Sequence, residues 1–162
     1  MNEIDQKQFL QILDANQHRI QKLCAMYTAQ HEDQKDLEQE VVLNIWKSYP
    51  NFKGDAKVST WIYRIILNVC LKHRYATTKN QKTVSLEIVK EVTASKTSKD
   101  EKFQDLRECI RALEFSDKSI IILYLEDLPY KSIADIIGIT ENHVAVKIKR
   151  IKAKLLTCLK NK

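Results

Sequence analysis

The sequence predicts an all-α fold in which two small helical domains are joined by a flexible linker. Glycine and proline number only 2 each among 162 residues, whereas average usage would give about 11 and about 8. A sheet fold of this size needs many turns, and turns depend on these two residues. Apolar residues make up 44% of the chain, and they recur at three- and four-residue steps, which is the helical period.

Two helices are predicted at the start of the chain, over residues 9–27 and residues 36–49. Pro50 ends the second, because the residue before a proline disfavours the helical conformation. The apolar stripe of the second helix comprises Leu37, Val41, Val42, Ile45, Trp46 and Tyr49. Its opposite face is polar and mostly acidic, and comprises Asp36, Gln39, Glu40, Asn44 and Lys47.

A third helix is predicted after a loop at residues 51–57. Ser59 or Thr60 can cap its first turn, and we expect it to run to about Tyr75. Its buried side comprises Ile62, Ile65, Ile66 and Val69, and its other side comprises Trp61, Arg64, Asn68 and Lys72.

Residues 76–100 interrupt the helical pattern. They hold 8 Ser/Thr, 5 Lys and no aromatic residue, a composition that buries too little surface to offset its ordering entropy. We therefore predict a flexible linker, in which only residues 84–92 (VSLEIVKEV) could form a short amphipathic piece.

Helices resume with a predicted amphipathic helix over residues 103–115. Residues 118–125 (KSIIILYL) are apolar on most sides and predict a buried helix. Residues 128–130 form a connector to the last part of the chain.

Residues 131–137 and 140–159 have the spacing of a helix-turn-helix. The small residue Ala134 lies where the helices cross, Gly138 makes the sharp turn, and Val144 anchors the second helix. Thr140 begins the second helix, and threonine is a good N-cap.

The second of these helices presents a basic face. Residues 141–162 carry 7 Lys/Arg against 1 acidic residue. The outward side chains are those of Asn142, His143, Val146, Lys147, Arg150 and Lys154. Polar side chains near the start of such a helix meet base edges while its basic body meets phosphates. The alternative is a bundle helix with a solvated lysine face.

Residues 52–74 interleave aromatic and basic side chains. Aromatic rings stack on unpaired bases and cations follow the nucleic-acid backbone, so this segment suits single-stranded nucleic acid. The alternative, which composition alone favours, is that Trp61 and Tyr63 are core residues.

The charge alternates along the chain. Residues 53–82 and residues 131–162 each carry a net charge of +6, and the segments before each are acidic. Two basic segments indicate two contacts with a polyanion. The alternative is that these charged segments are only solvent-exposed helix faces. The acidic face of residues 36–47 is either such a solvated face or a dock for a basic protein surface.

No compartment signal is evident in the sequence. The N-terminus is polar and acidic, unlike a signal peptide, and no apolar run approaches the roughly 20 residues of a membrane helix. The four cysteines lie far apart without paired spacing, and we expect small buried thiols in a reducing compartment. The four are Cys24, Cys70, Cys109 and Cys158. Together, these observations predict a cytoplasmic protein.

Taken in order, these segments resemble a bacterial RNA polymerase sigma factor of the extracytoplasmic-function (ECF) group. The resemblance spans residues 9–75 and 101–159, and the order and spacing of its motifs make it specific. The matching motifs are DLEQEVVLNIWK at 36–47, FKG at 52–54, STWIYRI at 59–65 with Asn68, YKSIA at 130–134 and GIT at 138–140, followed by Val144, Lys147, Arg150 and Leu155.

The resemblance implies three parts: sigma region 2 over residues 1–75, a linker over residues 76–100, and sigma region 4 over residues 101–162. Region 2 would bind the clamp helices of the largest polymerase subunit and melt and read the −10 promoter element. Region 4 would read the −35 element and meet the flap of the second-largest subunit. The family further implies an anti-sigma partner, no direct membrane contact, and no enzymatic activity, catalytic residue, metal or cofactor.

The resemblance also implies the residues of each contact. Contacts with core polymerase fall to Asp36, Leu37, Gln39, Glu40, Asn44, Trp46 and Lys47. Contacts with the −10 element fall to Phe52, Lys53, Lys57, Ser59, Thr60, Trp61, Arg64, Asn68, Lys72 and Arg74. Contacts with the −35 element fall to Lys131, Ser132, Thr140, Asn142, His143, Val146, Lys147, Arg150 and Lys154.

Two other classes stay open. A free-standing helix-turn-helix regulator that binds operator DNA as a dimer explains residues 131–162 but gives no role to residues 36–49. A metal-dependent enzyme has one hint, Cys70 followed by His73, without a second ligand pair.

Overall fold

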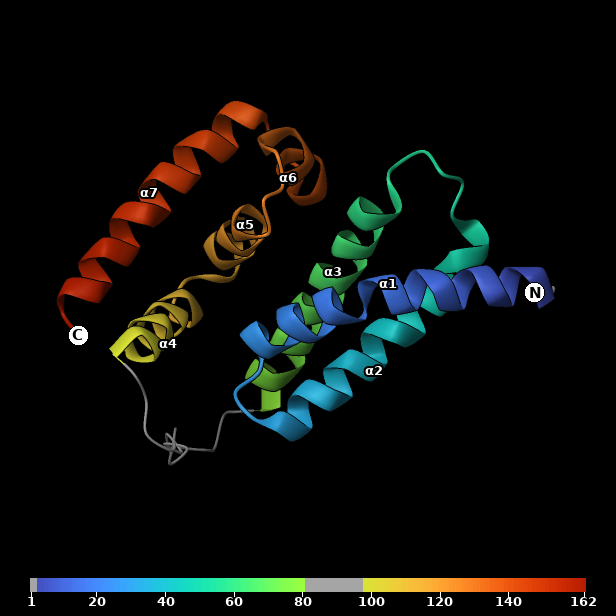
Figure 1. Ribbon diagram of the computed structural model, residues 1–162, viewed down its shortest axis with the longest axis horizontal. Coiled ribbons are helices and arrows are strands. Elements are labelled where there is room, and N and C mark those ends of the chain that lie inside the picture. Colours follow the sequence, from blue (N-terminus) through green and yellow to red (C-terminus); the bar gives the residue numbers. More distant parts are fainter. Residues whose placement is uncertain (1–2, 81–97) are drawn as a thin grey trace. The chain divides into compact units, whose positions relative to one another are not determined.

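A computed structural model describes residues 3–80 and 98–162 of the chain (Figure 1). All regular structure in these residues is helical, and the chain divides into two compact units, which confirms the predicted fold class. The predicted linker falls mainly on residues 81–97, which lie outside the described residues. In the part that is described, each helix is too short or too polar to cross a membrane.

The first unit contains helices α1 to α3. Its elements are α1 (Glu3–Tyr27), α2 (His31–Ser48), the 3-10 turn η1 (Tyr49–Asn51) and α3 (Val58–Asn80). Helices α1 and α2 pack against each other (Figure 1), and α3 contributes the remaining apolar stripe of the core. The largest fully buried side chains of this unit are Leu23, Leu37, Val41, Ile45, Ile62 and Ile66.

The boundaries in this unit differ from prediction at three points. Helix α2 begins at His31, ahead of the predicted Asp36, because two acidic residues in its first turn suit the positive end of the helix dipole. The Trp61 amide donates to the Lys57 carbonyl at 3.1 Å, so α3 starts before Ser59 and the predicted cap is wrong. Helix α3 also continues beyond Tyr75, since no glycine or proline follows to stop it.

The second unit contains helices α4 to α7. They are α4 (Ser98–Arg111), α5 (Phe115–Leu125), α6 (Tyr130–Ile137) and α7 (Glu141–Lys160). Two successive helices were predicted over residues 103–115 and 118–125, and the structure has two, but the break between them comes earlier than predicted, where the Leu113 amide donates to the Ile110 carbonyl at 3.1 Å. Helix α5 is buried as predicted, with Ser119, Ile120, Ile121, Ile122 and Leu123 all inside.

Helices α6 and α7 form the predicted helix-turn-helix. Gly138 has φ +84°, a left-handed conformation that side chains with a Cβ rarely adopt. The Ile139 amide donates to the Ala134 carbonyl at 3.2 Å, which closes the C-terminus of α6. The hydroxyl of Thr140 accepts from the His143 amide at 3.2 Å, which confirms the predicted N-cap of α7.

The cysteines divide into two pairs. Cys24 and Cys70 are buried free thiols, as predicted. The same expectation is wrong for Cys109 and Cys158, which form a disulfide between α4 and α7 with Cα atoms 6.0 Å apart. Their separation of 49 residues hid the pairing, because it depends on how α4 docks against α7.

Candidate nucleic-acid interface

The polar face predicted on α2 is exposed to solvent. Asp36, Gln39, Glu40 and Lys47 are exposed, whereas Asn44 is half-buried and donates from its side-chain amide to the Glu40 carbonyl at 2.8 Å. This face therefore presents two carboxylates to the surroundings within one turn of helix.

Two apolar residues of α2 that the resemblance assigned to the polymerase contact differ in exposure. Leu37 is 0% exposed, so it belongs to the core and is corrected from a contact residue to a packing residue. Trp46 is 41% exposed and packs edge-on against Phe9, with ring centroids 4.8 Å apart. Half of its indole therefore lies open beside Lys47 on the surface of α2.

The loop before α3 and the outer side of α3 form a basic surface. Its exposed polar residues are Lys53, Lys57, Arg64, Asn68, Lys72 and Arg74. Ser59 and Thr60, in the first turn of α3, are half-buried. The surface carries positive charge along one helix face, as a polyanion contact requires.

The aromatic residues of this segment divide between surface and core. Phe52 and Trp61 are half-buried and pack against each other, with ring centroids 4.6 Å apart and an interplanar angle of 31°. Tyr63 is 2% exposed and lies under the Arg19 guanidinium, 5.8 Å from its ring centroid. The core interpretation is thus correct for Tyr63, while Phe52 and Trp61 keep part of their rings accessible.

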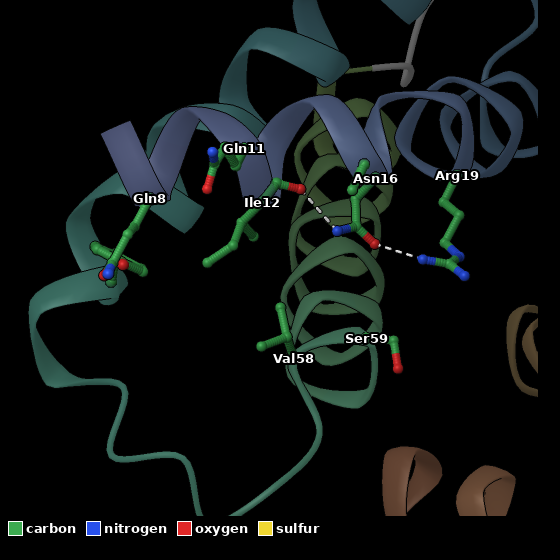
Figure 2. Close-up of a pocket in the computed structure, with 9 residues that line it drawn as sticks. Gln8, Gln11, Ile12, Asn16, Arg19, Val58 and Ser59 are labelled. Carbon is green, nitrogen blue, oxygen red and sulfur yellow. Dashed lines mark hydrogen bonds between the residues drawn. The ribbon is translucent and has the colours of Figure 1, made fainter. Parts of the chain in front are cut away.

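An open pocket of about 500 Å³ lies between α1, η1 and the start of α3 (Figure 2). Asn16, 4% exposed, donates to the Ile12 carbonyl at 2.7 Å and accepts from Arg19 at 2.7 Å. The other side chains with hydrogen-bonding groups in its lining are Gln8, Gln11, Tyr49 and Ser59. The sequence gives no local signal for this pocket, because α1 and α3 meet there only in the folded unit.

The basic face predicted on α7 is exposed over most of its length. Exposed positions are Thr140, Asn142, His143, Val146, Arg150 and Lys154. On α6, Lys131 is exposed and Ser132 is half-buried. The first turn of α7 therefore offers an amide and an imidazole, and its second turn offers the apolar side chain of Val146, which is 54% exposed.

Asp117 of α5 binds two of the lysines predicted to contact DNA. Its carboxylate lies 3.1 Å from the Lys147 ammonium and 2.6 Å from that of Lys154. The Asp117 side chain is 13% exposed, so the pairs lie at the edge of the core. Asp117 was not among the predicted site residues, because local spacing gives no signal for a partner that lies 30 residues away.

The two lysines also set the ionisation of Asp117. Burial by itself raises the pKa of this carboxyl, but hydrogen bonds from Lys154 and Lys147 outweigh burial and hold the pKa below its usual value. Asp117 therefore stays charged, and it draws the two ammonium groups toward α5.

The metal hypothesis finds no support around Cys70. Cys70 is 1% exposed, and its thiol makes a hydrogen bond with Cys24 that, together with burial, holds the pKa of Cys70 above its ordinary value. Among the residues that the structure describes, no three His, Cys, Asp or Glu side chains are grouped to hold a metal ion.

Two protein-family models match the chain. Sigma-70 region 2 matches residues 12–79, and Sigma-70 region 4 matches residues 103–155. The first match coincides with α1 to α3 and the second with α4 to α7, so each family model corresponds to one structural unit.

Relatives and solved structures agree with these matches. The chain is 27% identical over 158 residues to the ECF RNA polymerase sigma factor SigM of Mycobacterium tuberculosis, covering 96% of this chain and 79% of SigM. The sigma factor RpoE of Bartonella quintana, solved with the anti-sigma factor NepR, has a TM-score of 0.71 at 21% identity, with 96% of each chain covered. CnrH, solved with the cytosolic domain of CnrY, has a TM-score of 0.72 at 16% identity, covering 97% of this chain and 90% of CnrH.

Both domains of a minimal sigma factor are thus present in their expected order. The chain belongs to the ECF group of the sigma-70 family of RNA polymerase sigma factors. It is a promoter-directing subunit of RNA polymerase and not a free-standing regulator. Sigma factors recognise DNA without catalysing a reaction, so the chain is not an enzyme.

Proposed function

We propose that the two units divide promoter recognition between them. The unit of residues 1–75 docks on core polymerase and engages the −10 element, and the unit of residues 101–162 reads the −35 element. The observation that carries this proposal is the separation of charge, since an acidic face on α2 and basic faces on α3 and α7 are all exposed.

Docking on core polymerase falls to the polar face of α2. Asp36 and Glu40 lie one turn apart, both exposed, and they repel DNA but attract a basic protein surface. Trp46 adds an exposed half-ring at the end of this face, and aromatic residues of this kind anchor protein interfaces. The proposed partner surface is the pair of clamp helices of the largest polymerase subunit.

Engagement of the −10 element falls to the basic side of α3 and its preceding loop. Arg64, Asn68 and Lys72 follow one helix face at steps of one turn, which suits a nucleic-acid backbone. Phe52 and Trp61 expose parts of their rings beside this face. Such rings stack on unpaired bases, with about 1–3 kcal/mol per base, which favours strand opening.

Recognition of the −35 element falls to α7. Asn142 and His143, in its first turn, are exposed where a recognition helix meets base edges. Arg150 is exposed two turns further along and suits a phosphate contact. The opposite, apolar side of α7 is buried in its unit, so the basic face is held outward. A second partner of this unit would be the flap of the second-largest polymerase subunit.

We also propose control by an anti-sigma protein in the cytoplasm. Two proteins of similar fold have been solved with such partners, NepR and the cytosolic domain of CnrY. The exposed faces of α2, α3 and α7 are the surfaces that such a partner would cover. Affinity purification of the chain from its own host should recover a stoichiometric partner that prevents binding to core polymerase, and recovery of polymerase alone would contradict control by a partner.

The proposed docking face is tested by titrating labelled core polymerase with the full chain. Wild type is compared with Asp36→Arg/Glu40→Arg, which reverses both exposed carboxylates of α2. Glu101→Arg/Glu114→Arg makes the same charge change at exposed positions of the second unit and is the matched control. We expect tight binding by wild type and control and at least a tenfold loss for the α2 variant.

Two outcomes contradict the proposal. Equal losses in both double variants would mean that net charge, not the α2 face, sets the affinity. Unchanged binding of the α2 variant would remove this face from the polymerase interface. Circular dichroism of each variant establishes that the helices are intact.

A further inference from the structure

Two cysteines join the first and last helices of the second unit. The Sγ atoms of Cys109 on α4 and Cys158 on α7 are bonded at 1.99 Å. Cys109 is 2% exposed, whereas Cys158 is half-buried near the end of α7. Figure 1 shows this end of α7 beside α4. Cys158 is therefore the more solvent-exposed residue of the pair, and Cys109 is buried.

The redox conditions of the compartment in which a sigma factor acts decide whether this disulfide persists. A sigma factor works on polymerase and DNA, in a compartment where thiols are kept reduced and where disulfides are as a rule transient or redox-sensing. A pair of cysteines held close enough to bond, with one of the two partly exposed, fits a redox-sensing disulfide.

We propose that Cys109 and Cys158 form a reversible oxidation site, a dithiol–disulfide couple that fastens α4 to the end of α7. The oxidant is a low-molecular-weight disulfide. The Cys158 thiolate attacks one of its sulfurs, which forms a mixed disulfide and releases one thiol. The Cys109 thiolate then attacks the Cys158 sulfur and releases the second thiol. Two protein thiols lose two electrons and two protons, and the small disulfide is reduced to two thiols.

The first unit contains an internal comparison. Cys24 on α1 and Cys70 on α3 also lie in contact, but they are 0% and 1% exposed. A small disulfide cannot reach either sulfur in the folded unit, so this pair stays as thiols. Solvent access, rather than proximity, distinguishes the two pairs.

Oxidation changes how firmly α4 is held. Without the bond, α4 and α7 still pack against each other, and Glu108 of α4 forms an ion pair with Lys162 just beyond the end of α7. The ion pair is solvent-exposed and contributes little. The bond closes a loop that includes α5 and α6, which restricts the unfolded chain. Reduction should therefore loosen α4 first, at the edge of the unit that carries the −35 face.

The test uses the full chain equilibrated with oxidised or reduced glutathione. Remaining thiols are alkylated, and cysteine-containing peptides are identified by mass spectrometry. We expect oxidised glutathione to give a Cys109–Cys158 cross-link, to leave Cys24 and Cys70 as thiols, and to be reversed by dithiothreitol. Hydrogen exchange of α4 should slow on oxidation while that of α1 to α3 is unchanged. The melting midpoint of the second unit should rise on the order of 10 °C.

Matched variants separate this site from general oxidation. Cys158→Ser should abolish both the cross-link and the redox response of α4, whereas Cys24→Ala should keep them. A stable mixed disulfide at Cys158, a cross-link that forms only in denatured protein, or equal oxidation of Cys24 and Cys70 would each overturn the proposal. Loss of polymerase binding leaves it intact, since none of these readouts involves polymerase.

Discussion

The carboxylate of Asp117 on α5 lies 2.6 Å from the ammonium of Lys154 on α7, although the two residues are 37 positions apart. Lys147 donates to the other oxygen of the same carboxylate at 3.1 Å. One aspartate thus binds two of the cations proposed to face DNA. It couples the buried helix α5 to α7.

Replacing Asp117 by asparagine should destabilise the second unit. The change leaves the Lys147 side chain, 24% exposed, with a neutral partner, and we expect a loss of about 1 kcal/mol in the free energy of unfolding. Urea denaturation measures it. Glu101→Gln removes the same charge at an exposed position and should change the stability by less than about 0.5 kcal/mol. Equal effects of the two variants would mean that the Asp117 pairs contribute nothing.

The Asp117 contribution should disappear in acid. Because its pKa is lowered in the folded unit, the charged form stabilises folding above the unfolded pKa of about 3.9, and this contribution is lost as pH falls through the folded pKa. The stability difference between wild type and Asp117→Asn should be full at pH 7 and vanish below the folded pKa. Urea midpoints at several pH values measure it, and a constant difference would contradict the assignment.

Arg150 and Lys147 should differ in their effect on DNA binding, although both were predicted to contact the −35 element. Arg150 is exposed, so Arg150→Ala should reduce the salt slope of promoter binding by about 1. Lys147 already pairs with Asp117, and Lys147→Ala should change the slope less while lowering stability. Lys149→Ala, exposed on the same helix outside the predicted face, is the control. Equal slopes for all three variants would remove this face from the DNA interface.

Gly138 should resist substitution for a backbone reason. A Cβ placed there meets no atom within 4 Å, but φ is +84°, where an alanine is strained by about 1–2 kcal/mol. Gly138→Ala should therefore lower the free energy of unfolding by about 1 kcal/mol after allowance for the stiffer unfolded chain. Gly138→Asn should cost less, because asparagine tolerates this conformation better. Equal stability of wild type and the alanine variant would contradict the argument.

Trp61 should contribute to promoter opening. Its half-buried indole rests on Phe52, and loss of stacking on one base costs about 1–3 kcal/mol, so Trp61→Ala should reduce the open fraction of a suitable promoter at least fivefold. Permanganate reactivity of unpaired thymines measures opening. Trp61→Phe should retain most of the opening activity. Tyr75→Ala is the control, since it removes an exposed aromatic side chain of the same helix that is outside the predicted −10 contacts. Normal opening by Trp61→Ala would leave Trp61 with a packing role.

Much of the fold could be predicted from local pattern. The positions of Gly138 and Thr140 predicted the turn and the cap of the helix-turn-helix, and both are confirmed, because each depends on the conformation of its immediate neighbours. A break between α4 and α5 was predicted, but its position at residues 112–114 was not, since the apolar spacing continues through Leu113 and only packing decides where the chain turns.

The candidate site was predictable in part for the same reason. Helical periodicity separated exposed from buried positions on α3 and α7 and placed Leu37 in the buried stripe of α2, where the structure has it. Only the family resemblance assigned Leu37 to a contact with polymerase. Periodicity assigns a stripe, whereas the width of the buried stripe depends on how many neighbouring helices cover it.

The sequence by itself determined the helical class, the two separated basic segments and the helix-turn-helix spacing, because these depend on composition and on neighbours within a few turns. The tertiary structure decided which distant residues meet. The pairing of Cys109 with Cys158 and the binding of Lys147 and Lys154 by Asp117 both join residues at least 30 positions apart. Such contacts follow from the docking of one helix on another, which brings side chains together without any signal in the local sequence.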